Sequence, residues 1–227
     1  QRYEAMYFRG FTNLKQKNFE IGWELFDHRW NSPSFLSKRY NFETAEWNGS
    51  SGGEKLLIWD EQGPGDQIMC SLFFNKPLGN FKEIIILCDP RLQGIFSRCF
   101  DKNITFLRND YDIKKIKYDA HLSMFGLLKY YAKQDQDPKT NEVTLKFDDN
   151  EVKRIKRKLK GEKKICGISW FSKNNQSGKD RSYSLLNFIK SFGNSMHDYV
   201  YVNLQYDSST EEISQVSRKL GVTIYND

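Results

Sequence analysis

The stretch LLIWDEQGPGDQI at residues 56–68 decides the fold class. Its apolar first part predicts a short buried strand, and its second part predicts a turn that opens a helix. Two further apolar runs, EIIILC at 83–88 and ITFL at 104–107, follow with helix-like segments between them. Strands that alternate with helices predict an α/β fold built on a parallel sheet that is covered on both faces.

The segments around this sheet are also readable from their patterns. Two amphipathic helices are expected over 3–16 and 19–30, because their apolar residues recur with a period near 3.6, and Asn18 is the expected N-cap between them. Residues 31–54 are rich in Asn, Ser and Gly and predict a loop. The segment 121–133 begins like a strand and continues like a helix.

A second series of strands and helices follows a polar linker over 134–150 that carries Pro138. The expected elements are a helix over 149–160, strands over 165–170, 199–205 and 222–225, and helices over 184–194 and 210–220. The predicted organisation is therefore a helical pair with its linker at 1–44, a first domain at 45–148 and the beginning of a second domain at 149–227. We expect the second sheet to be incomplete and to leave an apolar face near 199–226 uncovered.

Composition limits the classes of function. Hydrophobic residues make up 38% of the chain, which is enough for a core, and the net charge of +6 is modest. The densest basic run, at 153–164, has helical spacing and is typical of a solvated helix face, so no nucleic-acid partner is predicted. The chain shows neither a signal peptide nor an apolar run long enough for a transmembrane segment, which predicts a cytoplasmic protein. It begins without Met and in a helical pattern, so we expect the true N-terminus to lie further upstream.

Cysteines and histidines give no sign of a metal or cofactor site. None of the cysteines forms a CxxC pair, and apolar surroundings predict free thiols for Cys70, Cys88, Cys99 and Cys166. His28, His121 and His197 are too far apart for a zinc motif. Only His121, at an expected strand end, is placed where a site could form, and a hydrogen-bonded structural role is its alternative.

The turn Glu61–Asp66 is the first candidate site, because open α/β sheets bind ligands beyond the carboxyl ends of their strands. Gly63 and Gly65 allow backbone conformations and close ligand approach that side chains would prevent. Asp66 at the helix start would be kept ionised by the helix dipole and could act as a base. The alternative is that Asp66 only caps the helix and the glycines only form a tight turn. Because Ile68 interrupts the GxGxxG fingerprint, a nucleotide-binding oxidoreductase is the weakest reading.

The polar loop after ICGISW (165–170) is the second candidate site. Cations together with hydroxyls and amides near a helix start suit a diphosphate. The loop and its flanks carry Ser169, Trp170, Ser172, Lys173, Asn174, Asn175, Lys179, Arg181 and Ser182. A solvated surface loop is the alternative interpretation.

Seven segments, taken in order, resemble the bacterial TPR-linked glycosyltransferases, which are distant relatives of O-GlcNAc transferase and of the lipopolysaccharide heptosyltransferases. The most specific is the apolar strand followed by EQGxGD. The segments are GWELFDHRW (22–30), AEWNG (45–49), LLIWDEQGPGDQI (56–68), DAHLSMF (119–125), GISWFS (167–172), RSYSL (181–185) and VNLQYD (202–207).

The resemblance implies a GT-B architecture, in which a TPR-like helical hairpin precedes two Rossmann-like domains that face each other across a cleft. The first domain would handle the acceptor and the second would grip a nucleotide-sugar. The implied reaction transfers a sugar to a hydroxyl of a protein or glycan, without a cofactor or a required metal. The family's later donor-binding segments are not in this chain, so this stretch alone is expected to be inactive.

The resemblance also implies roles for individual residues. Asp66 matches the catalytic base, with His121 as the second candidate. Substrate-binding roles are implied for Glu61, Gln62, Gly63, Gly65, Trp170, Lys179, Arg181, Ser182 and Gln205. The competing function is a catalytically inactive scaffold that binds a protein partner through the TPR-like segment.

Overall fold

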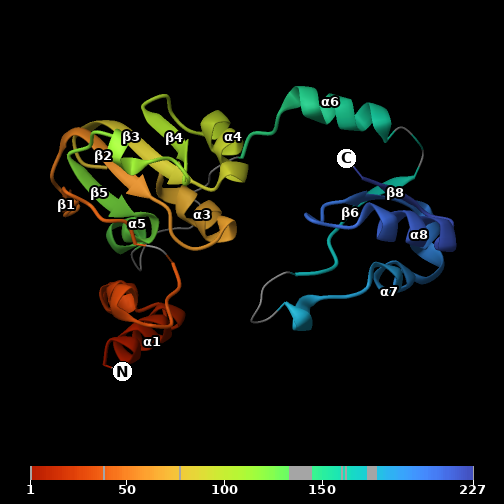
Figure 1. Ribbon diagram of the computed structural model, residues 1–227, viewed down its shortest axis with the longest axis horizontal. Coiled ribbons are helices and arrows are strands. Elements are labelled where there is room, and N and C mark those ends of the chain that lie inside the picture. The colour runs from red at the N-terminus through yellow and green to blue at the C-terminus, as the bar shows by residue number, and fades with distance from the viewer. Residues whose placement is uncertain are drawn as a thin grey trace. The chain divides into compact units, whose positions relative to one another are not determined.

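The computed structural model describes residues 2–37, 39–76, 78–132, 145–159, 161, 163–172 and 178–226. The chain forms two compact units, and the boundary between them lies between Phe147 and Asp148. Each unit contains a sheet of parallel strands with helices packed on it, so both have an α/β fold (Figure 1).

The first unit contains a helical pair followed by a five-stranded sheet with its connecting helices. Its elements are α1 (Arg2–Lys15), α2 (Phe19–Phe26), η1 (Asp27–Asn31), β1 (Ala45–Glu46), β2 (Gly53–Trp59), α3 (Pro64–Cys70), η2 (Ser71–Phe73), β3 (Phe81–Cys88), α4 (Pro90–Cys99), β4 (Ile104–Arg108), η3 (Ile113–Lys115), β5 (Ala120–Ser123) and α5 (Met124–Tyr131). The expected strands and helices over 56–133 are confirmed as an α/β series, with only η3 and coil between β4 and β5.

The strand order in this sheet is β1-β5-β2-β3-β4, and every neighbouring pair is parallel. At the centre, Leu57 of β2 lies in register with Ile85 of β3 on one side and with His121 of β5 on the other. The parallel sheet predicted for this part of the sequence is therefore confirmed. This strand order is compatible with a Rossmann-like fold.

The two faces of the sheet are covered by different kinds of structure. Leu56 and Ile58 belong to one core with buried residues of α3, α4 and α5. Leu57 and Trp59 point to the other face, because side chains alternate along a strand, and there they meet aromatic and aliphatic residues of segments 30–42 and 107–118. The chain returns from β4 to β5 through the short η3 and coil, so none of the described long helices of this unit comes from that connection.

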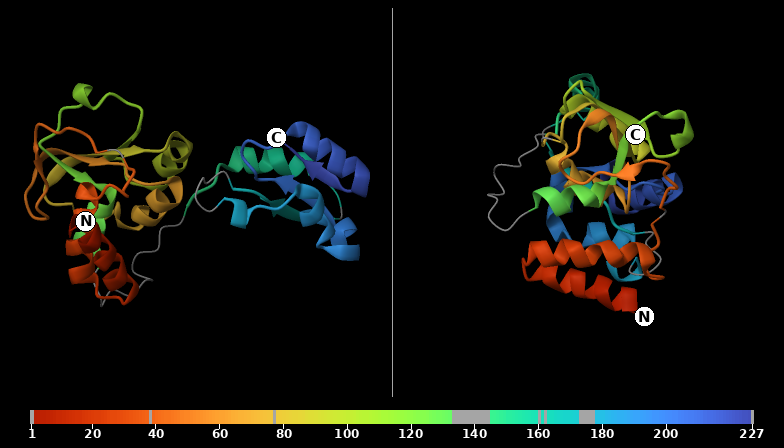
Figure 2. Two further views of the ribbon diagram at one scale, coloured as in Figure 1. Left: turned by 60° about the horizontal axis from the view of Figure 1, so that its bottom comes forward. Right: turned by 90° about the vertical axis from the view of Figure 1, so that its left-hand side faces the viewer.

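Helices α1 and α2 lie side by side and form a hairpin (Figure 2). They approach closely at Gly10, where an added Cβ would lie 2.8 Å from the backbone nitrogen of Phe26. Phe26 in turn belongs to the same core as the strand residue Leu56, which joins the helical pair and the sheet in one unit. Asn18 occupies the N-cap position of α2, but its side chain makes no capping hydrogen bond.

The second unit has a three-stranded parallel sheet in the order β6-β7-β8. Its elements are α6 (Asp149–Lys158), β6 (Lys164–Ile168), η5 (Lys179–Arg181), α7 (Leu185–Lys190), η6 (Gly193–Asp198), β7 (Tyr199–Asn203), α8 (Thr210–Leu220) and β8 (Thr223–Tyr225). The core is built around Trp170, Tyr201 and the buried residues of α7 and α8. Most of the expected linker over 134–150 lies outside the described residues.

Apolar side chains remain exposed in the second unit. Ile165 of β6 is 55% exposed, and Leu204, directly after β7, is 66% exposed. Among the described strands, β8 lies at an edge of the sheet. Leu204 lies within the segment 199–226 for which an uncovered apolar face is expected, and Ile165 lies in the neighbouring strand.

Several boundaries differ from the sequence expectation, and the segment 31–54, which the sequence predicts to be a loop, contains β1 and the first residues of β2. The helix that follows the turn at 61–66 begins within that turn, at Pro64, and its α-helical part ends at Cys70 before a short 3-10 turn. Proline suits the first helical position, because its fixed φ angle matches the helix and that position needs no N–H donor.

Candidate functional site

The first candidate site lies where the sheet order reverses. The chain proceeds from β2 to β3 and β4 on one side and then returns to place β5 on the other side of β2. The carboxyl ends of β2 and β5 therefore flank a topological switch point, where open α/β sheets place their ligands. The Glu61–Asp66 loop follows β2 at this point, and Ser123 ends β5.

The strained residue of this loop is Gln62, for which the family resemblance implies a substrate-binding role but no unusual backbone conformation. Its φ angle is +64°, in the left-handed region that non-glycine residues rarely adopt, at a typical cost of about 1–3 kcal/mol. The Gln62 N–H donates to Ser37 Oγ at 3.1 Å, which helps to hold this conformation. Gly63 has an ordinary φ of −86°. The expectation that glycines supply the unusual backbone conformation here is thus wrong for Gly63, and Gln62 supplies it instead.

The other half of that expectation, close approach of a ligand, concerns the open surroundings of Gly65. It is exposed at the start of α3, and a Cβ added there would meet nothing within 4 Å. No neighbour within the described chain therefore requires glycine at this position. The absence of a side chain leaves room for a close approach to the backbone beside Asp66.

Three carboxylates follow β2, and they differ in their partners. Asp60 accepts hydrogen bonds on both oxygens, from the Tyr40 hydroxyl and from the Asn109 amide, each at 2.8 Å. Burial and the Asp60 carboxylate both raise the pKa of the Tyr40 hydroxyl, so that group stays a donor. Asp60, directly after β2, therefore links the end of this strand to Asn109, which directly follows β4.

Glu61, expected to bind substrate, is buried at 2% exposure and is used inside the protein. Its two oxygens accept from Nε and Nη2 of Arg29 at 2.9 and 3.0 Å. One of them also accepts the Phe125 N–H at 3.0 Å. The matched fork of a guanidinium and a carboxylate explains why Glu61 turns inward, and it leaves this side chain no free oxygen for a substrate.

Asp66 is half-buried and accepts the Gly63 N–H through Oδ2 at 3.1 Å. It therefore caps the start of α3, as the simpler interpretation expected. Its Oδ1 has no hydrogen-bond partner in the described part of the chain. Among the three carboxylates after β2, Asp66 is the one with an oxygen still available to a ligand.

His121, the second candidate base, lies in a buried aromatic stack. Its ring packs on Phe42 with centroids 3.7 Å apart, and its Nδ1 accepts the Trp59 indole N–H at 3.3 Å. Burial and the charge of Arg39 lower the pKa of His121 to about 4, against a backbone hydrogen bond at Thr44 that raises it. At neutral pH the ring is an uncharged, buried packing group whose Nδ1 accepts the Trp59 N–H, which fits the structural interpretation.

In the second unit, Gln205 ties the ends of β6 and β7 together. It is 4% exposed, and its Oε1 accepts the N–H groups of Trp170 and Phe171 at 3.2 and 3.1 Å and the hydroxyl of Ser169 at 2.9 Å. Its Nε2 donates to the carbonyl of Tyr206. Trp170 is itself buried at 3% exposure in the core. Both residues were expected to contact a substrate, but here they shape the strand ends beneath the loop.

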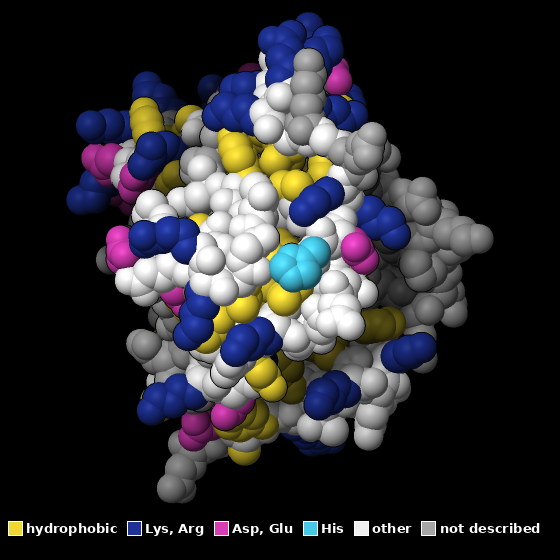
Figure 3. Space-filling view, turned by 90° about the vertical axis from the view of Figure 1, so that its right-hand side faces the viewer, with side chains coloured by type: hydrophobic (Ala, Val, Ile, Leu, Met, Phe, Trp, Pro, Cys, Tyr) yellow, Lys and Arg dark blue, Asp and Glu magenta, His cyan; other side chains and the backbone are white. Residues whose placement is uncertain are grey.

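The cations of the second candidate loop are placed differently. Lys179 and Arg181 are exposed on η5, and the side chain of neither makes a hydrogen bond or ion pair with another described residue. Ser182 orders this stretch by accepting the Ser172 N–H at 3.0 Å and donating to the Gly178 carbonyl at 2.5 Å. Lys173, Asn174 and Asn175 lie outside the described residues. Lys and Arg side chains are scattered over the face seen in Figure 3 rather than gathered into one patch.

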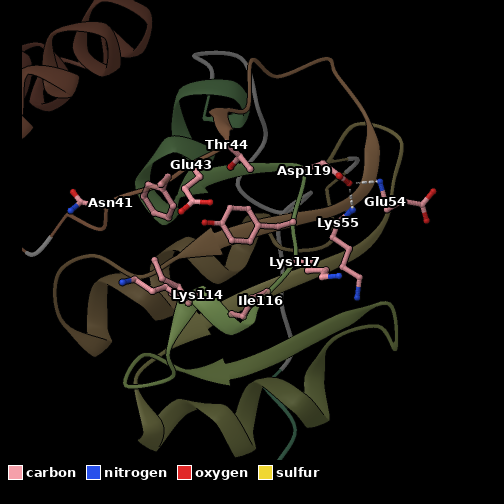
Figure 4. A pocket seen from close by; sticks show the side chains of 12 residues that line it. Asn41, Glu43, Thr44, Glu54, Lys55, Lys114, Ile116, Lys117 and Asp119 are labelled. Atoms are coloured by element: carbon pink, nitrogen blue, oxygen red, sulfur yellow. Dashed lines mark hydrogen bonds between the residues drawn. The ribbon is translucent and has the colours of Figure 1, made fainter.

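One hollow lies next to Gln205, and a larger one lies at the edge of the first sheet opposite the 61–66 loop. The first, of about 410 Å³, lies at the carboxyl end of β7 and is lined by Gln205 and residues 203–208 with Asn226. The larger one, an open groove of about 720 Å³, lies at the amino ends of β2 and β5, between Glu43, Lys114 and Lys117 (Figure 4). Figure 4 shows the groove lined by both acidic and basic side chains. It contains none of the sequence-predicted site residues.

Asp119 closes one end of the groove by accepting the N–H groups of Glu54 and Lys55 at 2.7 and 2.9 Å.

Within the described residues, no group of three or more His, Cys, Asp or Glu side chains could hold a metal ion. None of the described helices has the length and apolar content needed to cross a membrane.

Comparison with known proteins gives one distant relative. The chain is 25% identical to Protein FlbA of Caulobacter vibrioides over 225 residues, which is 90% of this chain and 37% of that relative. No family model matches the chain, and no solved structure matches it significantly. The chain thus spans little more than a third of the length of the curated relative to which it is similar.

Proposed function

We propose that this chain is part of a glycosyltransferase that moves a sugar from a nucleotide-sugar donor to a hydroxyl of a protein or glycan. The observation that carries the proposal is the free Oδ1 of Asp66 beside the open backbone at Gly65, at the switch point of the first sheet. A carboxylate that is held by one hydrogen bond and keeps one oxygen free is suited to take a proton from a bound hydroxyl.

In the proposed reaction, the acceptor oxygen forms a bond to the anomeric carbon of the sugar as the bond from that carbon to the diphosphate oxygen breaks. The hydroxyl proton goes to Asp66, and the leaving group departs as a nucleoside diphosphate. In the second unit, the exposed cations Lys179 and Arg181 are of the kind that binds a diphosphate. Ser182, Trp170 and Gln205 contribute by ordering the loop and the strand ends below it.

The two parallel-sheet units support a Rossmann-like, GT-B interpretation of the fold, and the helical hairpin supports a TPR-like one. A cytoplasmic location belongs to the same proposal, since the four cysteines are free thiols, which is typical of a reducing compartment.

A scaffold function is the second candidate, and one observation favours it. The helical hairpin exposes large apolar side chains, with Phe8 52%, Phe11 42% and Ile21 51% exposed. Exposed apolar patches on a helical pair are typical of a surface that binds another protein segment. This function requires no chemistry at Asp66.

The deciding experiment uses the full-length protein. It is incubated with a panel of nucleotide-sugars and with hydroxyl acceptors, and mass spectrometry follows both the modified acceptor and the released nucleoside diphosphate. We expect one donor class to give equal amounts of both products. A folded full-length protein that neither binds nor releases a nucleoside diphosphate would rule out the transferase and leave the scaffold.

A further inference from the structure

The buried side chain of Arg29 joins the helical segment to the carboxyl edge of the first sheet. Besides its two bonds to Glu61, the guanidinium donates from Nη2 to Ser123 Oγ at 3.1 Å. Its Nη1 donates to the Phe26 carbonyl at 3.3 Å and to Asp27 Oδ1 at 3.0 Å. All the donors of the guanidinium are therefore engaged, and one side chain connects η1 with the ends of β2 and β5.

The loop that carries Asp66 is held at three successive residues. Arg29 holds the side chain of Glu61, Ser37 Oγ accepts the N–H of Gln62, and Asp66 itself accepts the N–H of Gly63. The first two partners come from the segment that follows the helical hairpin. The direction of the Asp66 side chain thus depends on contacts that lie outside its own loop and strand.

A buried ion pair is a poor source of stability, because both charges lose their hydration, and an apolar pair of similar volume often serves as well. An apolar pair would fit here, because the surroundings of Arg29 are aromatic. Its guanidinium carbon lies 4.7 Å from the ring centroid of Phe26 and 4.5 Å from that of Trp30. A bidentate pair differs from an apolar contact in fixing the orientation of both partners.

We propose that Arg29 is a positioning residue, which acts through Glu61 to hold the 61–66 loop so that Asp66 faces the acceptor hydroxyl. This inference rests on the proposed transferase function. The residues that follow the helical hairpin would then help to form the site of the first unit, whether or not the hairpin itself binds a partner.

The test compares three changes in the full-length protein. The double variant Arg29→Met with Glu61→Met replaces the buried pair by apolar side chains and leaves no unpaired buried charge. Arg29→Lys keeps the charge but removes the fork. The matched control, Arg108→Met with Asp110→Met, removes a solvent-exposed pair of 2.7 Å in the same unit.

Two measurements are made on each variant: amide hydrogen exchange of residues 62–66, and steady-state transfer with separate kcat and KM for the donor. We expect the double variant to exchange faster at these amides and to lose about 10- to 100-fold in kcat, the typical effect of a misplaced catalytic group, while the donor KM stays within about twofold. Arg29→Lys should show a smaller change in the same direction, and the control should match the wild type.

Unchanged exchange and unchanged kcat in the double variant would overturn the inference. If the double variant does not fold, Arg29→Lys decides the question by the same two measurements, and wild-type values then overturn the inference. If the wild type shows no transfer with any donor, the proposed function fails. Faster exchange in the double variant would in that case still establish that Arg29 anchors the loop.

Discussion

Arg29 and Glu61 lie 32 residues apart in the sequence and meet as a bidentate ion pair, with Nε–Oε2 and Nη2–Oε1 distances of 2.9 and 3.0 Å. Both side chains are 1% exposed. This pair commits one of the three carboxylates after β2 to the interior, and Asp60 is committed to Tyr40 and Asn109. Asp66 is left as the carboxylate on which the proposed chemistry depends.

The first prediction concerns Asp66. Asp66→Asn should keep the hydrogen bond from Gly63 but remove the base, so turnover by the full-length enzyme should fall by about 10²-fold or more. Circular dichroism checks the fold. The control is Asp89→Asn, which alters the carboxylate that caps α4 at the end of the neighbouring strand and should leave turnover unchanged. Wild-type turnover in a folded Asp66→Asn protein would mean that Asp66 is only a cap.

The second prediction concerns donor binding. Arg181→Ala removes an exposed cation from the loop after β6 and should weaken binding of a nucleoside diphosphate by about tenfold, the worth of one charge-assisted hydrogen bond. Titration calorimetry on the full-length protein measures this affinity. Arg218→Ala, which changes an exposed arginine on α8, is the matched control. Equal affinities for the two variants would argue against a role for Arg181.

The third prediction concerns Gln205. Gln205→Leu should leave the N–H groups of Trp170 and Phe171 without their acceptor, which typically costs about 1–3 kcal/mol for each buried group. Amide hydrogen exchange at residues 164–171 should accelerate accordingly. Gln215→Leu removes an exposed hydrogen bond on α8 and should have little effect. Slow exchange in Gln205→Leu would show that another group satisfies these donors.

The fourth prediction concerns pH. The folded pKa of His121, about 4, lies below its usual value of 6.5, so the unfolded chain binds the proton more readily. The resulting stability is complete above about pH 6.5 and is lost as the pH falls toward 4, by at most about 1.4 kcal/mol per pH unit. Urea unfolding of the first unit between pH 4 and 7 measures this slope. His121→Gln should flatten this slope. An unchanged slope would contradict the claim that the lowered pKa of His121 causes it.

The fifth prediction concerns the thiols. Cys70 and Cys88 are fully buried, and burial raises the pKa of both thiols, to about 12 for Cys88. Cys99 and Cys166 are partly exposed. In the folded protein a thiol reagent should therefore label Cys99 and Cys166 first, and the other two only after unfolding. Recovery of fewer than four thiols in denaturant, without added oxidant, would contradict the expectation of free cysteines.

The sequence by itself determined the local elements of this protein. Strand and helix periodicities and the turn at 61–66 predict two α/β series, and the structure divides the chain between Phe147 and Asp148, close to the expected boundary at 148. These features could be predicted because they depend on residues within one turn or one strand of each other. The same local reasoning located Asp66 at a helix start beyond a strand end.

The tertiary structure decided which polar side chains remain available. Glu61 turns inward because Arg29 reaches it from the helical segment, and Gln205 is engaged because three donors converge on it from a strand end more than 30 residues away. His121 is buried because the sheet order places β5 beside β2, against Trp59. Each of these outcomes depends on a partner that is distant in the chain, and no local pattern of apolar and polar residues encodes such a meeting.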